Sequence, residues 1–307
     1  MSMKKKILVV SSANMDFVMD APYIPAAGET VICRGSYKYV PGGKGANSAV
    51  AFARLGADCA FCTRLGADGN GNALYDVYNN EGIDVSHIRR DPEAPTGLAA
   101  IMVGDDGNNR IMVYPGANMR IDNEQILEAV AEKPDALYMQ LEISREAVVF
   151  AANAAHEAGI PVFIDAGPAD PEFPFDRLPE LEVFSPNESE TEILTGIFPE
   201  SPEDCTNAAK KLAKLVAARY YVIKLGSRGC YVTDLDREFF SPSFKTRAVD
   251  TTAAGDSFTA ALTLEYLRSG DMEKAARYAN AVGSIVVGRP GAMPSIPTAD
   301  EVSAFFK

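Results

Sequence analysis

The sequence predicts an α/β fold, in which helices flank a doubly wound, mostly parallel sheet and a small β lid sheet is added to it. Short Val/Ile-rich segments alternate with longer amphipathic segments, as they do in successive βαβ units. Two further regions alternate apolar and polar residues, which is typical of antiparallel strands. We therefore expect a single domain over residues 1–307, with lid strands inserted at about 17–40 and 96–115.

The strand–helix alternation can be followed along the chain. Strands are expected at residues 7–10, 136–140, 161–165 and 220–225, and helices at 45–55 and 147–158. Gly56 and Gly159 follow these two helices, where left-handed caps are expected. Beyond Asp250 the pattern becomes almost entirely helical, with helices predicted at 255–269, 272–288 and 298–306.

The two alternating regions, residues 29–40 and 96–114, are predicted to form antiparallel hairpins, the second around a turn at 104–109. Strand pairs inserted in an α/β domain cannot join a sheet whose faces are covered by helices, so a separate small sheet is expected. We expect it to lie as a lid over the carboxyl ends of the parallel strands, where ligands bind in such folds.

Composition disfavours several classes of function. The formal net charge of −13 argues against nucleic acid as a partner, because its phosphates repel an acidic surface. No segment approaches the roughly 18 consecutive apolar residues of a membrane helix, so no membrane association is expected. The lysines at 4–6 precede an apolar stretch too short for a signal peptide. A cytoplasmic protein is the expectation.

The five cysteines are scattered along the chain, which suits free thiols in a reducing compartment. Cys59 and Cys62 have the spacing of half a zinc site, but their segment predicts a strand. Residues three apart on a strand face opposite sides, so these two thiols are not expected to share a metal ion.

A glycine-rich turn, Pro41-Gly-Gly-Lys-Gly-Ala-Asn47, leads into the first predicted helix. Its glycines permit close backbone approach, and the helix N-terminus offers free N–H groups. It matches neither the Walker A pattern nor GxGxxG, which also disfavours a dinucleotide-dependent dehydrogenase. Taken alone, the segment is equally explained by a tight strand–helix connection.

Two further polar segments stand next to predicted elements. Asn14 and Asp16 follow the first strand and place two short polar side chains on one face, which suits hydrogen bonding to sugar hydroxyls; an Asx turn is the simpler alternative. In Asp250-Thr-Thr-Ala-Ala-Gly-Asp256, small residues and an acid open a helix. Phosphoryl transfer needs such amide donors beside a base, although an acid there can simply complement the helix dipole.

Four segments in this order, residues 41–47, 185–190, 225–229 and 250–256, resemble the ribokinase (PfkB-type carbohydrate kinase) family, and the resemblance extends over nearly the whole chain. It implies transfer of a phosphoryl group from ATP to the 5-hydroxyl of D-ribose, with Mg²⁺ and a K⁺ activator. In this reading Asp256 is the general base, and the amides of Ala253, Ala254 and Gly255 form an anion hole. Many family members have Gly at position 253, and Ala can serve there if its φ stays negative.

The resemblance also implies three groups of binding residues. The sugar pocket is formed by Asn14, Asp16, Gly43, Lys44, Asn47 and Glu142. The ATP site is bordered by Asn187, Glu190, Lys224, Gly226, Ser227, Gly229, Gly255 and Asn280, with Glu190 near the magnesium ion. The monovalent cation lies near Asp250, Thr252, Val286, Arg289, Gly291 and Ser295. Together with the exposed lid strands, the resemblance predicts a homodimer in which two lids pair.

Structural explanations exist for several of these residues. Glu142 suits a solvated acid at a helix N-terminus, Asn187 an N-cap, and residues 225–229 a hairpin turn. Within the family, another pentose, a deoxypentose, a ketohexose or a nucleoside remains an alternative acceptor. A non-catalytic sugar- or nucleotide-binding regulator is the alternative outside the kinases.

Overall fold

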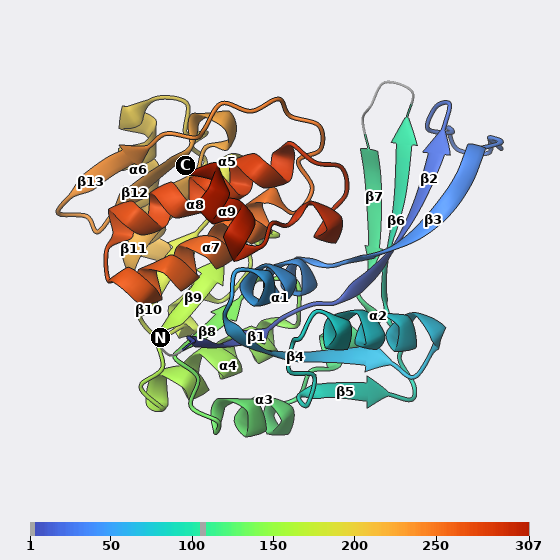
Figure 1. Ribbon diagram of the computed structural model, residues 1–307, viewed down its shortest axis with the longest axis horizontal. Helices are drawn as coiled ribbons and strands as arrows, with labels where there is room; N and C mark the ends of the chain where they lie inside the picture. The colour runs from blue at the N-terminus through green and yellow to red at the C-terminus, as the bar shows by residue number, and fades with distance from the viewer. Residues whose placement is uncertain (1–3, 105–108, 307) are drawn as a thin grey trace.

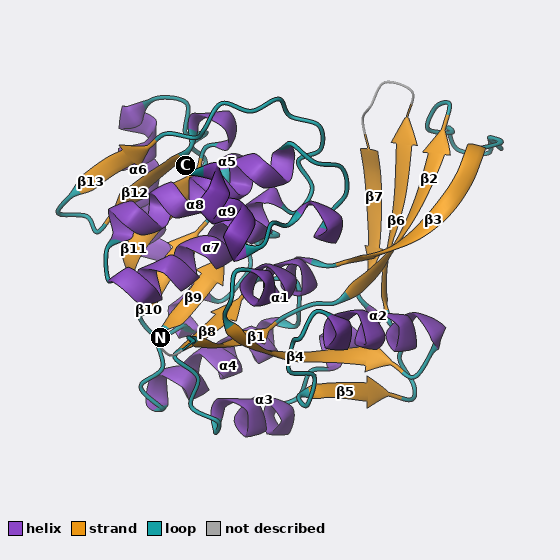
Figure 2. Cartoon of the chain, viewed as in Figure 1, coloured by secondary structure: helices purple, strands orange, loops and turns teal. Residues whose placement is uncertain are grey.

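The computed structural model of the chain describes residues 4–104 and 109–306. These residues form a large sheet with helices on both faces and a smaller sheet that projects from one end of the molecule (Figures 1 and 2). The predicted fold class is therefore confirmed. The turn expected at residues 104–109 lies mostly outside the described residues.

The large sheet has nine strands within the described residues, in the order β13-β12-β11-β10-β9-β8-β1-β4-β5. All neighbours from β11 to β5 pair in parallel, whereas β12 and β13 add an antiparallel edge. The strands are β1 Lys6–Val10, β4 Asp58–Gly66, β5 Ile88–Asp91, β8 Ala136–Met139, β9 Val162–Asp165, β10 Leu181–Ser185, β11 Ala218–Lys224, β12 Cys230–Thr233 and β13 Glu238–Ser241.

Helices cover both faces of this sheet and enclose two apolar cores. One face carries α1 Lys44–Arg54, α2 Gly69–Asn80, α7 Ala254–Ser269, α8 Met272–Val287 and α9 Ala299–Phe305. The other carries α3 Asn123–Val130, α4 Arg145–Glu157, α5 Glu188–Thr195 and α6 Pro202–Leu215. Each strand and helix predicted for the main sheet and its flanking helices agrees with an observed one to within a few residues. Gly56 and Gly159 have the positive φ of left-handed caps.

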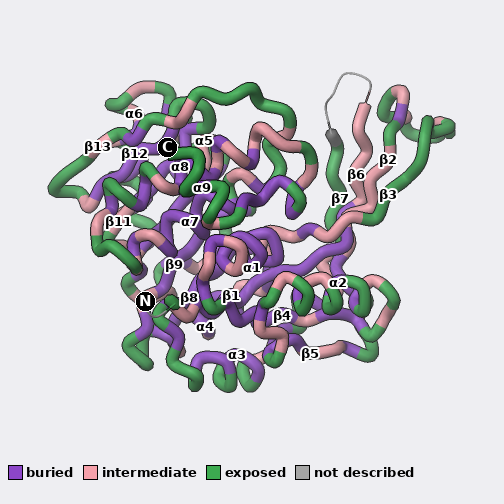
Figure 3. The backbone as a smooth tube through the Cα atoms, in the orientation of Figure 1, coloured by how far each residue is buried: buried purple, intermediate pink, exposed green. Residues whose placement is uncertain are grey.

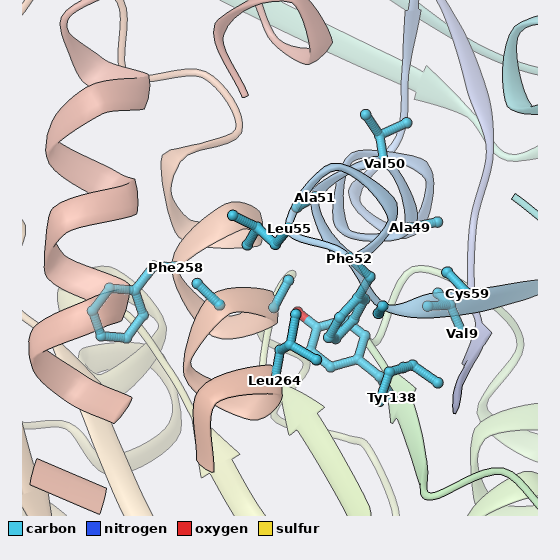
Figure 4. Packing of buried hydrophobic residues seen from close by; sticks show 14 of the residues in the cluster. Val9, Ala49, Val50, Ala51, Phe52, Leu55, Cys59, Tyr138, Phe258 and Leu264 are labelled. Atoms are coloured by element: carbon cyan, nitrogen blue, oxygen red, sulfur yellow. The ribbon is translucent and has the colours of Figure 1, made fainter. Parts of the chain in front are cut away.

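The alternation of the strands distributes their side chains between the two cores. In β1, Ile7 and Val9 enter one core, while Leu8 and Val10 enter the other. Figure 4 shows the first core, where the ring of Phe52 meets that of Tyr138 edge to face at 5.1 Å. Full burial of such a ring stabilises the fold by about 2–3 kcal/mol.

Cys59 and Cys62 lie on β4 and enter different cores, as the strand assignment predicted. All five cysteines are free thiols. Within the described residues, no helix combines the length and apolar character that crossing a membrane requires.

The lid sheet consists of β2 Asn14–Ala21, β3 Arg34–Gly42, β6 Gly97–Gly104 and β7 Asn109–Tyr114, in the order β3-β2-β6-β7. Two features differ from the prediction. Residues 29–33 are not part of a strand. The strand β3 pairs with β2, whereas a hairpin within residues 29–40 was predicted. Asn14 and Asp16 open β2 itself, so the alternative of an Asx turn is wrong.

Figure 3 shows that burial falls from the base of the lid towards its tip. The start of β2 is buried at Asn14 and Met15, whereas most of β3 is exposed. The sheet is therefore fixed at its base, where β2, β3 and β6 meet the main body.

Candidate active site

The candidate site lies where the carboxyl ends of the central parallel strands meet the N-termini of α1 and α7. Asn47 of α1 donates from Nδ2 to Oδ2 of Asp256 on α7 at 2.9 Å. The ammonium of Lys44 lies 3.9 Å from Asp256 Oδ1. Three predicted site residues, Lys44, Asn47 and Asp256, are thus neighbours, although Asn47 and Asp256 are 209 positions apart in the sequence.

Asp256 has the environment of a buried base. Its side chain is buried, and this burial raises its pKa to about 6; the Lys44 charge opposes the shift, as does the Asn47 hydrogen bond, while the charge of Asp165 adds to it. A carboxylate with this pKa is ionised at neutral pH and still basic enough to accept a proton.

Helix α7 begins directly at this carboxylate. Ala253 is its N-cap and Ala254 donates its N–H to Thr251 O at 3.2 Å. Within the described residues, the amides of Ala253 and Gly255 make no backbone hydrogen bond. Two of the three predicted anion-hole donors are therefore available to a ligand, and the third is shared with a turn.

The backbone of Ala253 differs from the condition set by the sequence. Its φ is +62°, in the left-handed region, so the negative φ under which alanine fits this position without strain is not found. A left-handed alanine costs roughly 1–2 kcal/mol because its Cβ approaches the following carbonyl oxygen. The turn that begins α7 therefore imposes a conformation that glycine would adopt without this strain.

A second buried carboxylate, which the sequence did not single out, lies beside Gly255. Asp165, the last residue of β9, accepts from the Lys224 ammonium at 2.5 Å and from the Thr259 hydroxyl at 2.6 Å. Lys224 and Asp165 are both buried. A Cβ placed on Gly255 would lie 3.9 Å from Lys224 Nζ, so this ion pair adjoins the start of α7. The only signal for Asp165 was its position at a strand end.

The glycine-rich turn packs directly against the start of the lid. A Cβ on Gly43, whose φ is +92°, would lie 2.7 Å from Asn14 N, and one on Gly42 would lie 2.1 Å from Asp16 Oδ2. Only glycine fits at these positions. The half-buried Asp16 has a pKa of about 7, raised by burial and then by the charges of Glu142 and Asp256.

Glu142 is not a solvated helix acid, because its carboxylate is engaged in the site. It accepts from the hydroxyl of Ser12, at 2.5 Å, and from the amide of Lys44, at 3.1 Å. The negative charge of Asp256 is the largest influence on the Lys44 ammonium and raises its pKa. Burial opposes this shift, and three further acidic neighbours add to it. Ser12 was not predicted, although it lies between the first strand and Asn14.

The residues predicted near the phosphates form a helix cap. Asn187 accepts from the Glu190 amide at 2.8 Å, and the Glu190 carboxylate accepts from the Asn187 amide at 2.7 Å. The structural explanation of Asn187 is thus confirmed, as a capping box at α5. Glu190 Oε1 also lies close to Lys44, since a Cβ on Gly167 would be 2.5 Å from this oxygen and 3.1 Å from Lys44 Nζ.

The remaining predicted nucleotide residues lie around the β11–β12 hairpin. Gly226, Ser227 and Gly229 form its turn, as the structural alternative proposed, and a Cβ on Gly229 would lie 2.0 Å from Ser241 O. The buried Asn280 of α8 donates to the carbonyl and the hydroxyl of Ser241, at 2.9 and 3.0 Å. Helix α8 and this hairpin are thereby held together.

The residues predicted for a monovalent cation come from two loops that the structure joins. Asp250 accepts from the amide and hydroxyl of Thr252 and from the amide of Gly291, at 2.9, 2.6 and 2.8 Å. Burial alone would raise the pKa of Asp250, but these hydrogen bonds lower it. The Val286 carbonyl accepts from the Arg289 amide, and the Ser295 hydroxyl donates to Ala292 O.

Among the described residues, no group of three or more His, Cys, Asp or Glu side chains is placed to hold a metal ion. A nucleotide-bound Mg²⁺ is held by phosphate oxygens and only one or two protein carboxylates. The carboxylate of Glu190 has the chemistry of such a ligand. Backbone carbonyls around Asp250 and Gly291 fit a monovalent cation in chemical type.

Similarity to known proteins extends over nearly the whole chain. Residues 4–299 match the model of the pfkB family carbohydrate kinases. The chain belongs to this family. It is 34% identical to a ribokinase of Haemophilus influenzae over 99% of both chains, and 30% identical to a deoxyribokinase of Salmonella typhi over 97% of this chain and 98% of the other.

The family fold is also found in solved structures. Arabidopsis thaliana ribokinase complexed with ribose and ATP superimposes with a TM-score of 0.90 and 32% identity, covering 99% of each chain. Ribokinase from Thermotoga maritima superimposes with a TM-score of 0.84 and 34% identity over 98% of each chain.

Proposed function

We propose that this protein is an ATP-dependent ribokinase that transfers the γ-phosphoryl group of ATP to the 5-hydroxyl of D-ribose. The observation that carries the proposal is the buried Asp256 carboxylate beside the free amides at the start of α7. Full-length similarity to ribokinases, one of them solved with ribose and ATP, supports this choice of substrates.

In this proposal Asp256 removes the proton from the sugar hydroxyl as its oxygen attacks the γ-phosphorus. The bond from phosphorus to the bridging oxygen of ATP breaks, and ADP leaves. Asn47 holds one oxygen of Asp256 and Lys44 lies near the other, so the carboxylate is oriented before substrate binds. The amides of Ala253 and Gly255 offer hydrogen bonds to the negative charge of the phosphoryl group.

The sugar pocket combines acceptors and donors that suit a small polyhydroxyl compound. Asp16, Glu142 and Asp256 accept hydrogen bonds, while Asn14 and Lys44 donate them. The Oδ1 atom of Asn47 is buried without a partner within the described residues, so a sugar hydroxyl would satisfy it. Closure of the lid sheet over the sugar would exclude water from the phosphoryl transfer.

Two metal ions and the nucleotide complete the proposal. Glu190 would stand near Mg²⁺, which neutralises phosphate charge when bound, while residues 224–229 and Asn280 would border ATP. A K⁺ ion would be held by the loops around Asp250, Thr252, Val286, Arg289, Gly291 and Ser295. Expression in the cytoplasm would keep the five thiols reduced.

The choice of acceptor can be tested with a panel under saturating ATP. Release of ADP would be measured with D-ribose, 2-deoxyribose, fructose and a nucleoside, and we expect ribose to give the highest kcat/KM. The similarity to a deoxyribokinase makes 2-deoxyribose the informative competitor. Preference for 2-deoxyribose or a nucleoside would overturn the proposed substrate, and no ADP release with any acceptor would favour a non-catalytic regulator.

The lid also supports the proposal of a homodimer. Its strands expose apolar side chains, with Tyr37 65% and Met112 62% exposed, and Phe17 packs against Tyr37 and Tyr39 at ring distances of 5.4 and 5.1 Å. A second lid would cover this surface and the edge strands β3 and β7. Small-angle scattering should give the mass of a dimer, and a monomeric mass at the assay concentration would contradict it.

A further inference from the structure

Asn118 lies at the base of the lid and has no role in the site described above. It belongs to the short helix Gly116–Arg120 that follows β7, and the residue is only 1% exposed. Its Oδ1 accepts from the Ala13 amide at 2.9 Å. Its Nδ2 donates to the Ala13 carbonyl at 3.2 Å and to Oδ1 of Asn14 at 2.8 Å.

These hydrogen bonds fix the orientation of two side-chain amides. A backbone N–H can only donate, so the atom of Asn118 that faces the Ala13 amide must be the oxygen. The nitrogen of Asn118 then faces Asn14 and requires an acceptor there. Asn14 must therefore turn its oxygen towards Asn118, which leaves its Nδ2 group on the opposite side.

The Nδ2 group of Asn14 remains available to a ligand. It makes no hydrogen bond within residues 4–104 and 109–306, and it is not among the polar atoms that are buried there without a partner. Asn14 and Asp16 are two residues apart on β2, so their side chains share one face of the strand. A donor from Asn14 thus stands beside an acceptor from Asp16.

We infer that Asn118 is a positioning residue of the sugar site, which holds Asn14 so that its N–H donors face the substrate. The inference rests on the proposed function and deepens it. A sugar hydroxyl can accept from Asn14 and donate to Asp16 at once, whereas a substrate that lacks this hydroxyl leaves both groups unpaired. Asn118 thereby determines that Asn14 offers a hydrogen-bond donor to the pocket and not an acceptor.

The absence of a side chain at Gly97 supports this arrangement. Gly97 begins β6, and a Cβ there would lie 2.2 Å from Asn14 Oδ1 and 2.4 Å from Asn118 Nδ2. The contacts of Asn118 with Ala13, Asn14 and Gly97 therefore join the start of β2, the start of β6 and the segment after β7. These hydrogen bonds lie at the base of the lid, where burial is high, and keep the donor fixed while most of β3 and residues 110–114 of β7 are exposed.

The test is the isosteric substitution Asn118→Asp. The introduced carboxylate still accepts from the Ala13 amide but cannot donate to Asn14, so the Asn14 amide rotates and presents its oxygen to the sugar. We expect the KM for ribose to rise by roughly tenfold or more, with kcat and the KM for ATP changed little. The rise should shrink at low pH, where a protonated carboxyl regains a donor.

The matched control is Asn153→Asp. Asn153 on α4 donates to the carbonyls of Val149 and Arg177, at 2.8 and 3.0 Å, so the same atoms change far from the site. We expect it to leave the KM for ribose unchanged. In an Asn14→Ala background, Asn118→Asp should add less than about twofold to the KM for ribose, because its effect acts through Asn14.

Three results would overturn the inference: an unchanged KM for ribose in a folded Asn118→Asp protein at pH values where the carboxyl is ionised, full additivity with Asn14→Ala, or an equal loss in the Asn153→Asp control. If Asn118→Asp does not fold, Asn14→Asp decides, since it keeps the bond from Asn118 and removes only the outward donor. A KM equal to that of wild type would then refute the inference. Failure of the wild-type protein to phosphorylate any sugar would instead refute the proposed function.

Discussion

The two buried carboxylates at the floor of the site, Asp256 at the start of α7 and Asp165 at the end of β9, have opposite surroundings. Asp165 accepts hydrogen bonds at Oδ2 from both the ammonium of Lys224 and the hydroxyl of Thr259. Asp256 has one amide hydrogen bond and an ammonium 3.9 Å away, and its pKa is raised to about 6. One carboxylate therefore stabilises the floor, and the other keeps the capacity to react.

The raised pKa of Asp256 makes the stability of the fold depend on pH. The pKa of Asp256 is higher in the folded protein than the 3.8 of an unperturbed aspartate, so the folded state binds more protons between about pH 4 and 6. The free energy of unfolding therefore falls as the pH rises through this window. Ionised Asp256 costs the fold roughly 3 kcal/mol at neutral pH, by the usual 1.4 kcal/mol per pKa unit.

The largest expected effect is that of Asp256→Asn. Removal of the base should lower kcat by at least 10²–10⁴-fold, while ribose binding measured by calorimetry stays largely intact. The variant should also unfold at a higher temperature at pH 7, since the buried charge is gone. A kcat within about tenfold of wild type would exclude Asp256 as the base.

Asp165→Asn should act in the opposite direction on stability. It leaves the buried Lys224 ammonium without its carboxylate, which typically costs about 3–5 kcal/mol of unfolding free energy. Urea unfolding at pH 7 measures this loss. If Asp165→Asn and Asp256→Asn changed stability by similar amounts and with the same sign, the contrast between the two carboxylates would be wrong.

The pH dependence sharpens the assignment of Asp256. Its carboxylate must be ionised to act as a base, so kcat/KM for ribose should fall about tenfold per unit below pH 6, after a shallower decline from about pH 7 as Asp16 is protonated. Lys44→Met removes the charge that holds this pKa down, so the acid limb should move to higher pH. The matched variant Lys38→Met, on the exposed part of β3, should leave the limb in place.

The smallest expected effect is that of Ala253→Gly. Glycine relieves the positive φ but adds freedom to the unfolded chain, for a net gain of about 0.5–1 kcal/mol. Its kcat should stay within about twofold of wild type, because the amide donor is retained. Lys133→Gly is the matched control, since Lys133 has a φ of +52° far from the site. Destabilisation by Ala253→Gly alone would show that the Ala253 methyl group contributes contacts.

The sequence by itself determined the fold class, the order of strands and helices, and the segments that gather at the carboxyl ends of the sheet. These features follow from hydrophobic periodicity and from glycines that mark turns, and both signals are encoded over a few residues. It also placed Cys59 and Cys62 on opposite faces of one strand. The resemblance of four segments to one kinase family was visible at the same level.

Only the tertiary structure decided how these side chains act on one another. The pairs Asn47–Asp256, Asp165–Lys224 and Ala13–Asn118 join residues that are 209, 59 and 105 positions apart, and no local pattern specifies such contacts. The positive φ of Ala253 likewise depends on the turn that brings α7 to the site. Hydrogen-bond geometry and the cost of burying charge are properties of the packed molecule, so the difference between Asp256 and Asp165 emerged only there.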